Sequence, residues 1–185
     1  MDFWEIHDQY YPRVRGFILG LVRDESLADD LVQETFIRIQ QNLHRLIDPS
    51  KISSWIFRIA YNLCQDHFRK RKESSLDESG IMERTGDPGD TNIQKEMEQR
   101  QMGECIQGKI NLLPEPLRAV IILFDTMDLS HQEIAESLGI SIENVKVRLH
   151  RARKKLKAIL EEECTFEVDE RNVLVCEPSN RKKSC

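Results

Sequence analysis

The chain has 185 residues, of which 39% are hydrophobic and 32% are charged, and its formal net charge is −5. This composition supports one or two small domains with a modest core and excludes a chain that is disordered throughout. The negative net charge also excludes a protein that simply coats nucleic acid. Any basic surface must therefore be balanced by acidic regions that face another partner, which we expect to be a protein.

Targeting and cysteine patterns favour the cytoplasm. The sequence shows no signal peptide and no apolar run long enough to span a bilayer. Its five cysteines are scattered and form no recognisable disulfide framework. We therefore expect a cytoplasmic protein in a reducing environment.

Two amphipathic helices are predicted at the start of the chain. Apolar residues recur at mostly helical spacing from Phe3 to Leu21, and Pro12 is expected to bend or divide this first helix. A second helix is expected to begin at Ser26, with Asp29 three residues later as an imperfect capping box. Its predicted buried stripe consists of Leu31, Val32, Thr35, Phe36, Ile39 and Leu43.

Polar side chains crowd the first half of this second helix. They are Asp29, Asp30, Gln33 and Glu34. One interpretation is ordinary acid enrichment, because carboxylates are favourable near the positive end of a helix dipole. The same side chains would repel DNA, and they suit contact with a basic or polar helix of a protein partner. We predict a docking face here.

A third helix is predicted over residues 54–72, after a short loop that contains Asp48 and Pro49. Its exposed side combines an aromatic ring, amides and charged groups: Arg58, Tyr61, Asn62, Gln65, Asp66 and Arg69. Such side chains can stack on unpaired bases and hydrogen-bond to them. The alternative is that the aromatic residue belongs to a core and that the terminal cations stabilise a helix C-terminus.

The composition changes abruptly after the third helix. Residues 73–91 are rich in Ser, Gly, Asp and Glu, which predicts an acidic flexible linker. A second helical domain is expected to begin near Asn92, to halt at residues 113–116 and to resume from Leu117 to Phe124. The chain is therefore interpreted as two helical bundles on a tether.

The stretch from Ser130 to Leu160 has the pattern of a helix-turn-helix. Ser130 and Glu133 form a capping box, which satisfies amide groups at a helix start. Gly139 ends the first short helix, because glycine readily takes the left-handed conformation that a sharp turn needs. Ser141 is predicted to cap the next helix. The packing stripe of that helix is Val145, Leu149, Ala152, Leu156 and Ile159.

Between Val145 and Leu160 the other face of this second helix carries cations with no acid among them. In a helix-turn-helix, its N-terminal residues lie over base edges while later cations meet phosphates. We therefore assign base reading to Glu143, Asn144, Val147 and Arg148. The rest of the predicted DNA surface is Lys146 together with Arg151, Arg153 and Lys154, the last three mainly as backbone contacts. A solvated basic helix on an ordinary protein surface is the alternative.

The tail from Cys164 to Cys185 contains two short alternating segments around a polar turn, which predicts a small β-hairpin. Cys164, Cys176 and Cys185 are candidates for a zinc or redox site, because three thiolates can hold zinc with a fourth ligand. No His follows His150 and no CxxC motif occurs, so unrelated free thiols are the leading interpretation. No metal and no cofactor are expected.

These segments together resemble the bacterial extracytoplasmic-function (ECF) sigma factors. The run from Ala28 to Phe36 is similar to the family's polymerase-docking helix. The run from Trp55 to Asn62, with Asp66 and Arg69, resembles its promoter-melting helix. Five short segments resemble the family's second DNA-binding domain: Leu113-Pro114, Glu133-Ile134-Ala135, Val145-Lys146, Arg148-Leu149 and Arg151-Ala152-Arg153. The resemblance covers about Phe3 to Leu160, apart from the linker.

The resemblance implies an all-α fold of two small bundles, with a possible short C-terminal β-hairpin. A sigma-2 domain over residues 1–72 would grip the clamp of core RNA polymerase and melt the minus-10 promoter element. An acidic linker over 73–91 would lead to a sigma-4 domain over 92–163 that reads the minus-35 element as duplex. The cysteine-containing tail would occupy 164–185.

Finer points also follow from the resemblance. The loop from Asp48 to Ser54, with Asn62 below it, would capture a flipped promoter base. An anti-sigma factor would hold the free protein. Residues 142–147 differ from the small residues and Thr or Ser that the family often has there. The promoter sequence that this chain reads therefore cannot be inferred from that of a relative.

Two other classes of function remain as alternatives. A two-domain transcriptional regulator would use the same helix-turn-helix and bind a ligand or phosphorylated partner through its N-terminal bundle. The sequence has no glycine-rich phosphate loop or receiver-like acidic cluster to support it. An enzyme would need a nucleophile, metal or acid–base cluster, and Asp29, Asp30 and five dispersed histidines make none. We therefore expect a sigma factor and not an enzyme.

Overall fold

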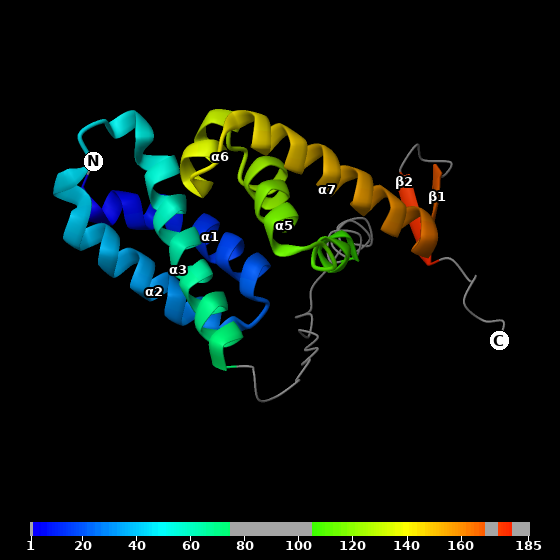
Figure 1. The fold of residues 1–185 in the computed structure, drawn as a ribbon, viewed down its shortest axis with the longest axis horizontal. Helices are drawn as coiled ribbons and strands as arrows, with labels where there is room; N and C mark the ends of the chain where they lie inside the picture. The colour runs from blue at the N-terminus through cyan, green and yellow to red at the C-terminus, as the bar shows by residue number, and fades with distance from the viewer. Residues whose placement is uncertain (1, 75–104, 169–173, 179–185) are drawn as a thin grey trace, which may run out of the picture.

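The computed structural model describes residues 2–74, 105–168 and 174–178. Within these ranges the chain is helical except for two short C-terminal strands (Figure 1). The N-terminal half contains α1 (Phe3–Val22), α2 (Glu25–Asn42) and α3 (Ile52–Ser74), with two 3₁₀ turns, η1 (Leu43–Arg45) and η2 (Pro49–Lys51), between α2 and α3. Most of the predicted acidic linker lies outside the described residues.

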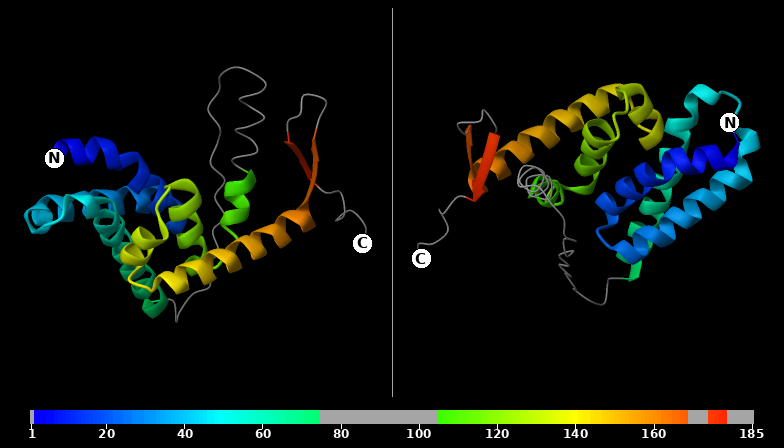
Figure 2. Two further views of the ribbon diagram at one scale, coloured as in Figure 1. Left: turned by 90° about the horizontal axis from the view of Figure 1, so that it is seen from above. Right: turned by 180° about the vertical axis from the view of Figure 1, so that it is seen from behind.

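The C-terminal half is built from shorter helices and one long one. Residues 105–110 are helical, followed by α5 (Glu115–Ile121), a π-helical segment η3 (Ile122–Thr126), α6 (His131–Leu138) and α7 (Ile142–Glu163). The far end of α7 extends away from the other labelled helices toward the strands (Figures 1 and 2). The predicted all-α architecture is confirmed.

Helix α1 runs unbroken through Pro12, so the expectation that this proline could divide the helix is wrong. Proline removes one backbone hydrogen bond and crowds the preceding turn. Tyr10 and Val14 are buried on either side of it, and this continuous packing holds the helix together. A capping box between Asp2 and Glu5 fixes the start of the helix.

Helix α2 begins before the predicted Ser26. The Asp24 side chain is the N-cap and accepts a hydrogen bond from the Leu27 amide at 3.0 Å, so Glu25 is already helical. Aspartate and serine are comparable caps, and only the backbone geometry selects between two candidates this close in sequence. Most of the predicted stripe is buried, including Val32 and Ile39.

The helix-turn-helix is formed as the sequence predicts. The Ser130 and Glu133 capping box is present, and Gly139 ends α6 in the left-handed region at φ 66°. The Ser141 hydroxyl accepts a hydrogen bond from the Asn144 amide at 3.2 Å, so it caps α7. The predicted apolar residues of α6 and of the first half of α7 are buried: Ile134, Ala135, Leu138, Val145, Leu149 and Ala152.

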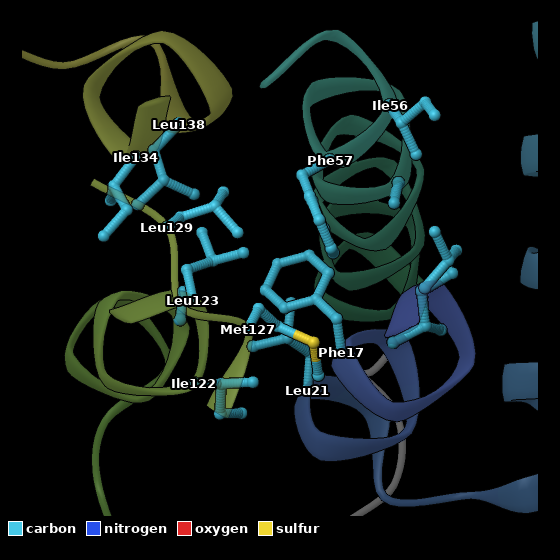
Figure 3. Packing of buried hydrophobic residues seen from close by; sticks show 14 of the residues in the cluster. Phe17, Leu21, Ile56, Phe57, Ile122, Leu123, Met127, Leu129, Ile134 and Leu138 are labelled. Carbon is cyan, nitrogen blue, oxygen red and sulfur yellow. The ribbon is translucent and has the colours of Figure 1, made fainter. Parts of the chain in front are cut away.

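The two halves pack against each other through one hydrophobic core. Helices α3 and α6 lie side by side, and buried residues of α1 and α3 meet residues of η3 and α6 between the halves (Figure 3). Phe17 and Phe57 pack edge to face, with their ring centroids 5.4 Å apart. A Cβ at Gly20 would lie 2.7 Å from Ile122 Cδ1, so glycine allows α1 to approach η3 closely.

Arginine side chains also join the halves through backbone carbonyls. Arg118 of α5 is buried and donates to the Leu21 carbonyl of α1 at 2.9 Å and to the Asn111 carbonyl at 3.0 Å. Arg23 donates to the same Asn111 carbonyl at 3.0 Å. These bonds satisfy carbonyls at the ends of helical segments, which have no partner within the helix.

The C-terminal strands β1 (Cys164–Val168) and β2 (Leu174–Pro178) pair antiparallel. In this register Cys164 lies opposite Pro178, and Phe166 lies opposite Cys176. The predicted turn at 169–172 and Cys185 lie outside the described residues. The candidate zinc or redox site therefore stays a prediction.

Candidate polymerase and promoter-DNA interfaces

The outer face of α7 carries the residues predicted to contact duplex DNA. Six of them are charged or polar and exposed: Glu143, Asn144, Lys146, Arg151, Arg153 and Lys154. Val147 is 45% exposed beside them, so its methyl groups can make an apolar contact with a thymine methyl group. The buried stripe of the helix faces α5 and α6, so the remaining side is open to a groove of DNA.

Glu143 stands at the start of α7 as a stable carboxylate. Its own backbone N–H and the Ser141 hydroxyl hydrogen-bond to it and lower its pKa. A carboxylate here also benefits from the positive end of the helix dipole. In a major groove it can accept a hydrogen bond from a cytosine amino group, which makes it a candidate for base selection.

Arg153 and Arg148 differ from the other cations of α7. Arg153 donates to the Asp125 carboxylate at 2.9 Å, and its guanidinium lies 4.9 Å from the centre of the Phe124 ring. It therefore helps to hold α7 against η3. Arg148 is half-buried. Burial raises the pKa values of Glu115 and of Tyr61 on α3, and the charge of Arg148 opposes this rise in part. Arg148 thus lies on the side of α7 that faces the N-terminal half.

The predicted docking face on α2 is partly engaged in ion pairs. Asp29 accepts from Arg15 Nε at 2.8 Å, and Glu34 accepts from Arg38 Nε at 2.7 Å. Asp30 and Gln33 are exposed.

Sequence reasoning missed one residue on this face. Ile37 is 48% exposed and stands one turn beyond Gln33 and Glu34, so it is a candidate apolar anchor for a partner. The helical spacing from Asp30 could have identified it, because residues three and four apart lie on one face.

The predicted surface of α3 divides into an open and a covered part. Arg58 and Asn62 are exposed, and Arg69 pairs with Asp66 at 2.9 Å on the surface. Tyr61 and Gln65 are half-buried under Glu115 of α5, and Gln65 Nε2 donates to the Glu115 carboxylate at 2.8 Å. Burial raises the pKa of Tyr61 to about 12, and the charge of Glu115 adds to the effect.

The loop before α3 is ordered by Asp48. Its carboxylate accepts from the Ser50 hydroxyl at 2.7 Å and from the Ser50 amide at 3.0 Å, and these bonds lower its pKa. Next to it, Glu136 of α6 accepts from Lys51 and Ser54. Neither Glu115 nor Glu136 was singled out from the sequence, because their partners are 50 or more residues away along the chain.

The described ranges hold no group of three or more His, Cys, Asp or Glu side chains placed to bind a metal ion. Among the same residues, no helix combines the length and apolar character needed to cross a membrane. The acidic and basic surfaces on α2, α3 and α7 are therefore the candidate functional sites of the described chain.

Comparison with known proteins agrees with this arrangement. The Sigma-70 region 2 family model matches residues 6–74, and the Sigma-70, region 4 model matches residues 103–156. RNA polymerase sigma factor SigZ of Bacillus subtilis is 37% identical over 169 residues, which is 91% of this chain and 93% of that protein. ECF RNA polymerase sigma factor SigM of the same organism is 32% identical and covers 86% of this chain and 95% of its own length. The chain belongs to the ECF family of RNA polymerase sigma factors.

Two solved structures have the same fold. The sigma factor RpoE of Bartonella quintana, in complex with the anti-sigma factor NepR, matches with a TM-score of 0.73 at 25% identity. That match covers 86% of this chain and 97% of the other. CnrH, in complex with the cytosolic domain of CnrY, matches with a TM-score of 0.62 at 25% identity, covering 86% and 88%. In this ECF sigma factor, region 2 thus corresponds to α1–α3 and region 4 includes α5 and α6 and most of α7.

Proposed function

We propose that this sigma factor binds core RNA polymerase and directs promoter-specific initiation through the surfaces described above. The observation that carries the proposal is 37% identity to an RNA polymerase sigma factor across 91% of the chain. The structure supports it with an exposed basic recognition helix in region 4 and an acidic exposed helix in region 2. The chain acts as an initiation factor, without a reaction or cofactor of its own, in the cytoplasm where polymerase and chromosomal DNA meet.

Region 4 reads the minus-35 element as duplex through α7. Base contacts come from the first two turns, where Glu143, Asn144 and Val147 are exposed. Arg151 and Lys154, further along the helix, meet phosphates and fix its register in the groove. Arg153 contributes less to DNA, because Asp125 and Phe124 already hold its guanidinium.

Region 2 opens the minus-10 element along α3. Arg58, Asn62 and Arg69 stand on the open part of the surface, where they can contact an unpaired strand. Asp66 adds to this surface beside Arg69, and Tyr61 and Gln65 complete it once the covering residues move. The loop that Asp48 orders, above Asn62, is the place for an extruded base.

Helix α2 docks on core polymerase. Asp30 and Gln33 are exposed and Ile37 adds apolar area, a combination that suits a partner helix with cations around an apolar strip. Asp29 and Glu34 extend the acidic rim, although each already pairs with an arginine of its own chain. We place the functional units at residues 1–72 and 92–163.

An anti-sigma factor is the remaining partner. Two structural neighbours, RpoE of Bartonella quintana and CnrH, were solved with proteins bound to them, an anti-sigma factor in the first case and the cytosolic domain of CnrY in the second. Because this chain shares their fold at 25% identity over 86% of its length, we propose that a protein of this kind binds it too.

Transcription in vitro tests the function directly. Core polymerase is incubated with genomic DNA fragments, with and without the full chain, and the 5′ ends of the transcripts are mapped. New start sites with a shared upstream element are expected only when the chain is present. Identical start sites in both reactions would show that the chain is not a sigma factor. A Lys146→Glu/Arg151→Glu variant serves as the matched control, because it should still bind core polymerase but lose these starts.

A further inference from the structure

A hollow of about 420 Å³ lies between one side of α7 and the first residue of α6. Its wall on α7 follows the helical repeat, because positions 146, 150, 153, 154 and 157 recur three and four residues apart and share one face. The buried Leu149 also lines it. The other lining residues are all cations or histidines: His131, Lys146, His150, Arg153, Lys154 and Lys157.

The wall of the hollow is fixed by contacts outside it. Arg153 donates to the Asp125 carboxylate of η3 at 2.9 Å, and the Phe124 ring centre lies 4.9 Å from the Arg153 guanidinium. The His131 ring packs on the same phenyl ring, with the two centroids 5.1 Å apart. Phe124 therefore positions one side chain from α6 and one from α7 around the hollow before any ligand arrives.

The carboxylates nearest the hollow have other contacts. Asp125 pairs with Arg153, and Glu161 pairs with Lys157 at 3.5 Å. Glu143 accepts hydrogen bonds from Ser141 and from its own amide, and the charge of Lys146 acts on it. The acids on the approach to α6 and in its first turn, Asp128 and Glu133, line a separate hollow beside Arg13.

These placements leave a positive potential in the hollow on α7. The side chains of Lys146, His150 and Lys154 are exposed there, so a ligand from solution can reach them. A surface lined by cations attracts anions. A phosphate is the anion that fits this chemistry, because lysine and histidine side chains can both donate hydrogen bonds to its oxygens.

We propose that this hollow binds backbone phosphates of the minus-35 duplex, and that His131 and His150 contact them as imidazolium ions, which makes binding of the duplex depend on pH. The inference rests on the proposed function, since it places the DNA backbone beside the groove that α7 reads. It adds two histidines to a surface so far assigned to lysines, arginines and the base-reading residues.

The arrangement of the two helices supports a backbone contact at this place. In a helix-turn-helix the second helix lies in the major groove while the first crosses the backbone. His131 begins that first helix and lies across the hollow from the cations of α7. A strand that leaves the groove on this side therefore passes between His131 and His150.

Protonation links this contact to pH. A histidine side chain generally changes charge between about pH 5 and about pH 8. Hydrogen bonds from an ionised donor to an anion are about twice as strong as those between neutral groups. Each added cation that meets a phosphate also releases about one counterion from the DNA. Both the affinity and its dependence on salt should therefore increase as the pH falls.

Two double variants of the full chain test the proposal. His131→Gln/His150→Gln keeps polar side chains but cannot gain charge at low pH. His131→Lys/His150→Lys carries the charge at both pH values. His44→Gln is the matched control, because His44 lies in η1 of region 2 and does not line the hollow. Helical content by circular dichroism, measured at each pH, checks that all three variants fold.

The affinity of the full chain for a labelled duplex is measured by fluorescence anisotropy at several salt concentrations, at about pH 6 and about pH 8. The slope of log affinity against log salt should be steeper at the lower pH by roughly one for each histidine. At about 0.1 M salt this corresponds to a rise in affinity of up to about eightfold for each histidine.

The variants should divide this effect cleanly. The double Gln variant should show the shallower slope at both pH values, the double Lys variant the steeper slope at both, and His44→Gln the behaviour of the wild type. A wild-type slope that does not change with pH would overturn the proposal. So would a pH dependence that survives in the double Gln variant, because the protons would then be taken up elsewhere.

Two duplexes of equal length separate phosphate contacts from base contacts. One carries the minus-35 element found by mapping transcript starts, and the other has an unrelated sequence. Phosphates carry no sequence information, so the effect of pH should be the same on both. An effect confined to the minus-35 duplex would mean that the histidines read bases, and the phosphate site would be wrong. Failure of the proposed function looks different, because the chain would then start no new transcripts while the unrelated duplex still showed the pH effect.

Discussion

Helices α7 and α3 are both assigned to promoter DNA, but the rest of the chain covers them to different extents. On α7, Asn144, Lys146 and Arg151 are exposed. On α3, Tyr61 and Gln65 are half-buried under Glu115. Both helices are amphipathic with a polar outer face, so their own sequences do not distinguish them. The difference comes from the packing of region 4 on region 2.

This difference separates two kinds of DNA contact. A duplex groove can meet most of α7 without any rearrangement of the chain. A single strand can reach the covered part of α3 only after the contact between the halves is broken. The accessibility of each surface therefore depends on the free energy of a long-range interface, which mutations far from either DNA surface can change.

The largest expected effect comes from breaking the shared core. Phe57 is 0% exposed and packs against Phe17, so Phe57→Ala should lower the free energy of unfolding by about 3–5 kcal/mol. Urea unfolding followed by circular dichroism measures this. Because the core is common to both halves, the wild type should show a single unfolding transition.

The control is Trp4→Ala, at a residue that is 68% exposed, which should change the free energy of unfolding by no more than about 0.5 kcal/mol. Equal effects of the two substitutions, or two separate transitions in the wild type, would contradict a shared core.

Local features of this core and of the helix-turn-helix could be predicted from the sequence. The Ser130 and Glu133 capping box, the turn at Gly139 and the buried positions Val145 and Leu149 all rest on residues three to five apart. At that spacing the geometry of a helix alone decides which side chains meet. The fold class and the position of the recognition helix followed from such signals.

Long-range features could not be predicted in this way. The bond between Ser54 and Glu136 joins residues 82 apart in sequence, and Arg118 reaches the Leu21 carbonyl across 97. No periodicity in the sequence encodes such a pair. The start of α2 at Asp24 was missed for another reason, since two good caps stood two residues apart and only backbone geometry chose between them. The covering of α3 was therefore visible only in the structure.

The second prediction concerns α2. The contact between the halves does not cover its outer face. Asp30→Lys/Glu34→Lys should abolish detectable binding to core polymerase, a loss of at least about 2 kcal/mol if these residues are central to the interface. Helical content should not change, although the pair of Glu34 with Arg38 is worth a few tenths of a kcal/mol and is lost. Binding is measured by fluorescence anisotropy of labelled chain, with Asp8→Lys as a control, because Asp8 lies on α1 and is 86% exposed. An unchanged affinity and salt dependence in the double variant would remove α2 from the docking surface.

The third prediction separates two roles on the exposed face of α7. Asn144→Ala should cost about 1–3 kcal/mol and relax the preference at one position of the minus-35 element. Lys154→Ala should weaken all duplexes alike and reduce the slope of log affinity against log salt by roughly one. Both are measured with the full chain on a set of single-base variants of the duplex at several salt concentrations. If Lys154→Ala changed which sequence is preferred while Asn144→Ala did not, the register of α7 in the groove would be wrong by about one turn.

The smallest expected effect is a shift in the pKa of one side chain, Tyr61. This pKa measures how far region 4 covers α3. Burial, followed by the charge of Glu115, raises the pKa of Tyr61 from 10.0 to about 12. The neutral phenol therefore stabilises the closed state, in which region 4 covers α3. This stability is fully present below about pH 10 and is lost as the pH rises through about 12. Closure and a protonated Tyr61 favour each other, so an opened chain should ionise this residue at lower pH.

Ultraviolet difference spectra of tyrosinate can follow this ionisation, and Tyr61→Phe subtracts the signal of the other two of the chain's three tyrosines. In the wild type, Tyr61 should remain largely protonated at about pH 10.5, above the ordinary pKa of a tyrosine side chain. Ser137 of α6 is buried 3.2 Å from the Ser54 carbonyl of α3, so Ser137→Arg should force the two helices apart. It should move the pKa of Tyr61 back toward 10, because opening returns the phenol to water. Glu115→Gln should move the pKa part of the way, since it removes the neighbouring charge and leaves the burial. A wild-type Tyr61 that titrates with the ordinary pKa would mean that region 4 does not cover α3 in solution, and the contrast between α3 and α7 would then disappear.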